Sequence, residues 1–138
     1  MQSLRNKIIV IGPSHINSLG VIRSLGEFGC RVFYIDHLGK AGFSTKSRYI
    51  EKYWVADDDS SVIDILMTKF NHEQKKPILI PASDKSTSIL DRHYNLLAQN
   101  FILPNIDERE NAISRMMDKN ALNQLAKEHG FVVPNSIN

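Results

Sequence analysis

The chain has 138 residues, with 42% hydrophobic residues, 23% charged residues and a formal net charge of +2 at pH 7. These values are typical of one folded domain and exclude a disordered, collagen-like or low-complexity chain. The charges are spread along the sequence, so we expect no nucleic-acid partner. The sequence has no apolar run near the roughly 20 residues of a membrane span and no signal peptide, so we expect a cytoplasmic protein and no membrane partner.

The first segments predict a strand followed by a helix. Residues 7–11 are rich in β-branched side chains and end at Gly12, which predicts a strand buried on both faces. From Ser14 onward the apolar residues recur at helical spacing, and Gly29 is placed to end that helix in a left-handed conformation.

The same alternation continues along the chain. Further strands are predicted at residues 31–35, 53–55, 77–81 and 101–103. Between them we predict an irregular loop over 38–49, a helix after the aspartates at 57–59, and a helix with Ile89 to Leu97 on its apolar side. Four or five parallel strands covered by helices make an α/β, Rossmann-like, doubly wound sheet.

Beyond Ile106 the alternation stops. Two short helices are predicted over 108–117 and 119–129, with Asp107 and Asp118 as caps and Gly130 after the second helix. The residues at 131–134 are typical of a new strand, but the few residues after them offer nothing for it to pack against. The chain is thus expected to be a truncated part of a longer protein. We therefore divide it into a Rossmann-like domain at 1–106 and a helical linker with the start of a truncated module at 107–138.

Ligand sites in doubly wound sheets lie outside the carboxyl ends of the strands. Four residues follow strands or lie in the loops at that edge and are candidates for binding a substrate: Ser14, His15, Arg48 and Asp84. Each also has a structural alternative, because Ser14 and Asp84 suit helix caps and loop cations are commonly solvated. The sequence alone leaves both interpretations open.

The known nucleotide and metal motifs are absent. The fingerprint G-x-G-x-x-G does not follow Gly12, although Asp36 stands near the place of a ribose-binding carboxylate, and no P-loop occurs. The single cysteine, Cys30, excludes an internal disulfide and a multi-thiolate zinc site. The aspartates at 57–59 are better explained as a charged helix start than as a cation site. We therefore predict no metal site and no catalytic residue.

Five short segments occur in a recognisable order. They are Ile8-Ile9-Val10-Ile11-Gly12, Ser47-Arg48-Tyr49, Pro81-Ala82-Ser83-Asp84, Met117-Asp118-Lys119 and Gly130-Phe131-Val132-Val133-Pro134. This order resembles the N-terminal region of ATP-grasp carboxylate–amine ligases. That group includes carbamoyl-phosphate synthase large subunits, biotin carboxylase, D-alanine ligase and D-aspartate ligase-like proteins.

The resemblance implies a pre-ATP-grasp domain followed by the start of an ATP-grasp module. It implies an enzyme that joins a small-molecule carboxylate to an amine through an acyl phosphate, with Lys119 matching the family lysine that reaches the ATP phosphates. ATP and Mg²⁺ are then expected for the full-length protein, neither is expected to bind tightly to this chain, and the chain alone should not turn over ATP. The sequence leaves open whether the protein forms a homodimer. The alternative is a stand-alone Rossmann-like module that binds a nucleotide or sugar nucleotide through residues 12–15 and Asp36.

Overall fold

The computed structural model describes residues 6–37 and 39–134. Four parallel strands form one sheet in the order β3-β2-β1-β4. The strands are β1 (Ile8–Gly12), β2 (Val32–Asp36), β3 (Ile50–Val55) and β4 (Ile78–Pro81). A parallel bridge between Ile78 and Ile102 adds one residue of a fifth strand at the β4 edge. The predicted α/β class with a parallel sheet is therefore confirmed.

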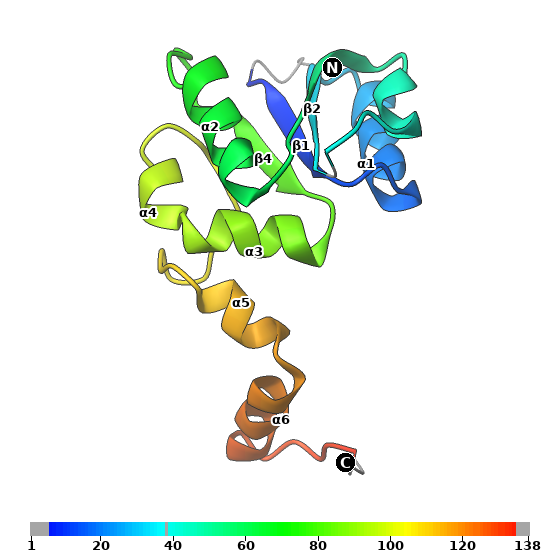
Figure 1. The fold of residues 1–138 in the computed structure, drawn as a ribbon. Helices are drawn as coiled ribbons and strands as arrows, with labels where there is room; N and C mark the ends of the chain where they lie inside the picture. Colours follow the sequence, from blue (N-terminus) through cyan, green and yellow to red (C-terminus); the bar gives the residue numbers. More distant parts are fainter. Residues whose placement is uncertain (1–5, 38, 135–138) are drawn as a thin grey trace.

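Helices cover both faces of this sheet. The helical elements of the described chain are α1 (Ile16–Glu27), the 3₁₀ turn η1 (Phe43–Lys46), α2 (Asp59–Lys69), α3 (Asp84–Arg92), α4 (Tyr94–Leu97), α5 (Ala112–Met117) and α6 (Lys119–Glu128), of which α5 and α6 lie away from the sheet. In Figure 1, α1 lies on one side of the strands and α2, α3 and α4 lie on the other. No helix in the described part of the chain is both long and apolar enough to cross a bilayer.

The two layers follow from the alternation of side chains along the central strands. In β1, Ile9 and Ile11 pack into the core beneath α2 and α3, whereas Val10 packs against Ile22 of α1 on the opposite face. All five residues of β1 are buried. A strand that is apolar at every position can bury both faces only in a three-layer fold, which explains why its sequence does not alternate between polar and apolar residues.

Several predicted boundaries differ from the structure. The predicted helix through Ile89 and Leu97 is broken at His93, whose backbone leaves the helical region between α3 and α4. The helix expected from residue 108 begins only at Ala112, because Asp107 takes a positive φ of 53° and lies outside the helix that it was expected to cap.

Other terminal predictions have mixed outcomes. Asp118 caps α6 by accepting hydrogen bonds from the amides of Asn120 and Ala121, as predicted, and Gly130 follows with a φ of 77°. Residues 131–134 form no strand, since Val132 is fully exposed and has no neighbouring strand in the described structure. Leu38 and residues 135–138, which belonged to the predicted loop and the last segment, lie outside the described residues.

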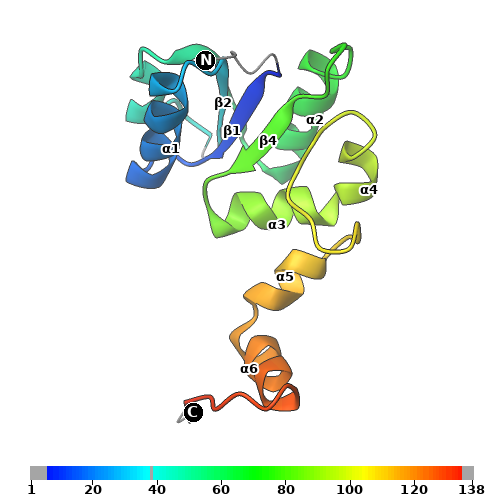
Figure 2. The ribbon, with the colours of Figure 1, turned by 180° about the vertical axis from the view of Figure 1, so that it is seen from behind.

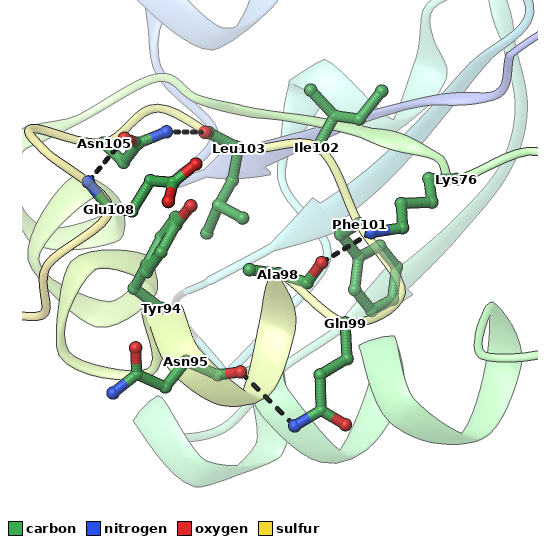
Figure 3. Close-up of a pocket in the computed structure, with 10 residues that line it drawn as sticks. All are labelled: Lys76, Tyr94, Asn95, Ala98, Gln99, Phe101, Ile102, Leu103, Asn105 and Glu108. Carbon is green, nitrogen blue, oxygen red and sulfur yellow. Dashed lines mark hydrogen bonds between the residues drawn. The ribbon is translucent and has the colours of Figure 1, made fainter.

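The helices α5 and α6 form an arm that extends away from the sheet, as both views show (Figure 1 and Figure 2). Neither helix contains a buried residue. Large apolar side chains remain exposed on this arm at Met116, Leu122, Phe131 and Val132. The division at residue 106 stays a prediction, although the arm begins shortly after it.

Asp91 of α3 attaches this arm to the body. Its carboxylate is buried and accepts hydrogen bonds from the Ser114 amide (2.8 Å), the Ser114 hydroxyl (2.7 Å) and the Ile113 amide (3.3 Å). The Asp91 carbonyl also accepts a bond from the Asn111 amide at 3.2 Å. Amides in the first turn of a helix have no intrahelical acceptor, so a carboxylate from a distant helix caps α5 in place of a local side chain.

We expect the substitution Asp91→Ala to release α5 from the body. It leaves two amides of α5 without their charged acceptor, and losses of this kind amount to about 2 kcal/mol. Hydrogen exchange of the Ile113 and Ser114 amides should accelerate about 30-fold while the amides of β1 remain protected. The control Asp64→Ala removes an exposed carboxylate of α2 and should change neither rate; equal protection of α5 in both variants contradicts the assignment.

Candidate binding site at the carboxyl ends of β1 and β4

The strand order creates a crevice between β1 and β4. The two strands are neighbours in the sheet, but the helix after β1 packs on one face and the helix after β4 packs on the other. A ligand can therefore approach the strand ends from between the two connections. A pocket of about 660 Å³ lies there. Its lining residues are Pro13, His15, Asn17, Pro81, Ala82, Ser83, Asp84, Lys85 and Thr87.

Two helix N-termini border this pocket. His15 is the N-cap of α1, and its Nδ1 accepts a long hydrogen bond (3.4 Å) from the Asn17 amide. The first turn of α1 contains no acidic residue. The positive end of the α1 dipole is therefore not neutralised within its own helix, and it favours an anionic group in the pocket.

Ser83, not Asp84, caps α3. The Ser83 hydroxyl accepts from the Ser86 amide and the Ser86 hydroxyl accepts from the Ser83 amide, both at 3.1 Å, which forms a reciprocal capping box. Helix capping, which was the structural alternative to a binding role for Asp84, is therefore performed by Ser83. The Asp84 side chain is exposed at the pocket, where a carboxylate suits a cationic group such as an ammonium.

Ser14 and Asp36 belong to a separate buried cluster. The Ser14 hydroxyl donates to Oδ2 of Asp36 (2.8 Å), and the same oxygen accepts from the Gly42 amide (2.9 Å). The Ser44 amide in turn donates to Ser14 Oγ at 3.2 Å. Asp36 is 0% exposed. The Ser14 side chain is engaged in these bonds and does not line the β1–β4 pocket. Asp36 is covered by the loop that carries Gly42.

Gly42 makes this closure sterically feasible. A Cβ atom at position 42 would lie 2.1 Å from Ser14 Cβ and 2.3 Å from Ser14 Oγ, so a larger residue would push the loop away from the cluster. Close backbone approach is a common reason for glycine at such a position. The loop between β2 and β3 is therefore folded tightly over the end of β2.

The structure places the remaining candidates elsewhere. Arg48 lines a different pocket beside α1, together with Tyr49. Lys119 is the first residue of α6 and is exposed on the arm. Of the sequence-predicted site residues, His15 and Asp84 are the pair that line one pocket, and their role in binding a substrate stays a prediction.

Sequence reasoning missed Asn17, Lys85 and Thr87, which also line the β1–β4 pocket. Each lies in the first turn of a helix that follows a strand, so the position after the predicted strand end is a usable signal. The side-chain chemistry is mixed: Asp84 contributes a carboxylate, and Lys85, whose Nζ lies 3.5 Å from Asp59, contributes a cation. The pocket can therefore receive both anionic and cationic groups of a small molecule.

Charged groups near the start of α2 form an ion cluster. Asp59 lies 3.1 Å from Arg92, 3.5 Å from Lys85 and 3.2 Å from His37 Nε2. Desolvation opposes ionisation of this carboxyl, but its cationic neighbours outweigh that effect and lower the pKa of Asp59. Asp58 caps α2 through the Ser61 amide at 2.8 Å.

The aspartate run is thus the start of helix α2. Within residues 6–37 and 39–134, no three side chains of His, Cys, Asp or Glu are grouped so that they could share a metal ion. Carboxylates that start a helix and pair with Lys and Arg side chains serve the helix dipole and the packing of α2 against α3.

Comparison with known proteins identifies the fold of this chain but shows no family to which it belongs. No family model and no curated protein matches this sequence. The fold is similar to that of a solved L-amino acid ligase from Bacillus licheniformis, with a TM-score of 0.69 and 13% sequence identity over 96% of this chain and 32% of that chain. The predicted resemblance is thereby confirmed at the level of the fold, and the chain spans about a third of the length of that ligase.

The burial of Tyr34 in β2, next to Asp36 in the chain's buried core, should affect the stability of the protein at alkaline pH. Tyr34 is buried and donates to the Gly12 carbonyl at 2.8 Å; desolvation, aided by the charge of Asp36, raises the pKa of Tyr34 to about 12. An unfolded tyrosine has a pKa of about 10. The folded state therefore binds more protons between about pH 10 and 12, and the free energy of unfolding falls by up to about 3 kcal/mol as the pH rises through this window.

Urea unfolding at several pH values from 9 to 12 measures this effect. In Tyr34→Phe the contribution of the tyrosine to the alkaline slope should vanish, whereas Tyr53→Phe, which changes an exposed residue of β3, should retain the wild-type slope. An unchanged slope in Tyr34→Phe would show that this hydroxyl is not held in its neutral form by the fold.

Proposed function

We propose that this chain is the substrate-side domain of an ATP-dependent ligase that joins a carboxylate to an amine through an acyl phosphate. The proposal is supported by the likeness of nearly the whole chain to about a third of an L-amino acid ligase. In this proposal the chain binds and orients a substrate. Turnover requires segments that correspond to the rest of such a ligase.

The observation that carries the proposal is the mixed charge of the pocket between β1 and β4. The unneutralised N-terminus of α1 favours a carboxylate, and the exposed Asp84 favours an ammonium. A ligase of this class has one substrate with each of these groups. A pocket with a positive and a negative border is also able to hold both groups of one small zwitterion.

For Lys119 we propose a contact with the phosphates of ATP. It begins α6, and its side chain is exposed rather than engaged in an ion pair within the described structure. An ammonium beside a transferring phosphoryl group offsets the negative charge that develops there. The Mg²⁺ ligands would have to come from another part of the ligase, since the described residues contain no suitable cluster.

The stand-alone nucleotide-binding module is less well supported. That function needs an accessible carboxylate at the end of β2 to accept the ribose hydroxyls. Asp36 occupies this place, but it is fully buried and already accepts hydrogen bonds from Ser14 and Gly42. A dinucleotide could reach it only after the loop at residues 42–44 had moved away.

We expect the β1–β4 pocket to distinguish three small probes of similar size. L-Alanine carries both an ammonium and a carboxylate, propionate carries only the carboxylate, and ethylamine carries only the ammonium. In NMR titrations of the 138-residue chain, L-alanine should shift the amides of residues 15–17 and 82–87 with millimolar affinity and bind more tightly than either single-charge probe.

Substitution at Asp84 tests the same pocket. Asp84→Asn should weaken the binding of L-alanine and ethylamine about three- to five-fold, the usual range for one exposed charge pair, and should leave propionate unaffected. The control Asp64→Asn removes an exposed carboxylate of α2 outside the pocket. If L-alanine shifts no pocket amide, or if both variants behave alike, the assignment of this pocket to the substrate is wrong.

Calorimetric titration separates the two functions. Because Asp36 is covered, we expect no micromolar binding of NAD or UDP-glucose to this chain. Micromolar binding of either compound would favour the stand-alone module and contradict the ligase proposal. Asp36→Asn serves as a second check, since a ribose contact predicts weaker binding in that variant.

A further inference from the structure

Arg48 lies in a second pocket whose chemistry differs from that between β1 and β4. This basic pocket, about 370 Å³ in volume, lies between α1 and the segment from Phe43 to Tyr49. Leu19, Arg23 and Glu27 line it from one stripe of α1, since they are spaced four residues apart. It shares no lining residue with the β1–β4 pocket.

Close packing fixes the wall that carries Arg48. The Tyr49 ring lies directly against Gly26 of α1, where an added Cβ would come within 2.2 Å of Tyr49 Cγ. The Arg48 guanidinium lies 4.9 Å from the centre of the Tyr49 ring and donates to the Tyr49 hydroxyl at 2.9 Å. One of its five N–H donors is used in this bond, and the others remain to bind a ligand.

The charge of the basic pocket is strongly one-sided. Three cations line it, Arg23, Lys46 and Arg48, against one carboxylate, Glu27. The local balance of +2 equals the formal net charge of the whole chain. Cations that converge on one concave site favour an anion, and arginine in particular suits planar or tetrahedral oxyanions.

An apolar surface lies beside these cations. Phe43 is 54% exposed at the start of η1, and Leu19 lines the same pocket from α1. In the basic pocket an inorganic anion would leave this apolar surface in contact with water. A ligand that carries a ring or a branched alkyl group next to its anionic group would cover it.

We propose that the basic pocket binds an organic anion that carries an aromatic or branched apolar group. The anionic oxygens bind to Arg23, Lys46 and Arg48, and the apolar group packs against Phe43 and Leu19. This site is separate from the proposed substrate pocket, and the proposal does not depend on the ligase function.

Three probes distinguish the contribution of the anionic group from that of the apolar group. Phenyl phosphate has both the ring and the anion, inorganic phosphate has only the anion, and benzyl alcohol has only the ring. In NMR titrations of the 138-residue chain, phenyl phosphate should shift the amides of residues 43–49 with saturation and bind at least about five-fold more tightly than inorganic phosphate. Equal affinity of the two phosphates overturns the proposal, as do shifts that never saturate or that centre on another surface.

Matched variants test the named residues. Arg48→Gln and Lys46→Gln should each weaken phenyl phosphate about three- to five-fold, and Phe43→Ala should reduce its affinity to that of inorganic phosphate. Lys52→Gln is the control, because Lys52 is also an exposed cation over an aromatic ring, 5.3 Å from the Trp54 ring centre, but does not line the basic pocket. Unaltered amide spectra away from the substitution confirm folding, and a control that weakens binding as much as Arg48→Gln contradicts the site.

Discussion

The burial of β1 on both faces is the constraint on which the rest of the structure depends. Its five residues are all buried, with Ile9 and Ile11 beneath α2 and α3 and Val10 beneath α1. Such a strand requires a parallel neighbour on each side and a helical layer on each face. Because the connections from β1 and β4 then leave toward opposite faces, the crevice at their carboxyl ends is a geometrical consequence of the buried core.

At the end of β2 the Asp36 carboxylate is buried, whereas the neighbouring β1–β4 pocket is open to solvent. A buried carboxylate needs hydrogen-bond donors to offset the cost of its desolvation. Oδ2 of Asp36 obtains donors from Ser14 and the Gly42 amide, and these bonds hold the loop over the end of the strand, whereas the buried Oδ1 has no hydrogen-bond partner within the described residues. The loop thereby covers the place where a dinucleotide-binding domain exposes its carboxylate, while the β1–β4 pocket stays open beside it.

Local sequence patterns were sufficient for the fold but not for the site. The strand and helix alternation, the left-handed Gly29 and the cap at Asp118 all depend on residues within a few positions of one another. By contrast, Asp91 caps a helix that begins 21 residues later, and the placement of Arg48 depends on which side of α1 the loop follows. No periodicity encodes such contacts. The Asp84 case lies between these, because a Ser-Asp pair at a helix start leaves the choice of cap open until the backbone geometry is known.

The arm has a different energetic basis from the body. An isolated helix of 10 residues such as α6 is marginal in water, and α6 buries no residue that could compensate. Its orientation rests on α5, and that of α5 rests on the Asp91 carboxylate and the backbone bond at Asn111. Leu122 and Phe131 remain exposed on this arm, so neither contributes a buried contact that would fix its position. The orientation of the arm relative to the sheet therefore depends on one buried carboxylate and the few hydrogen bonds that it accepts.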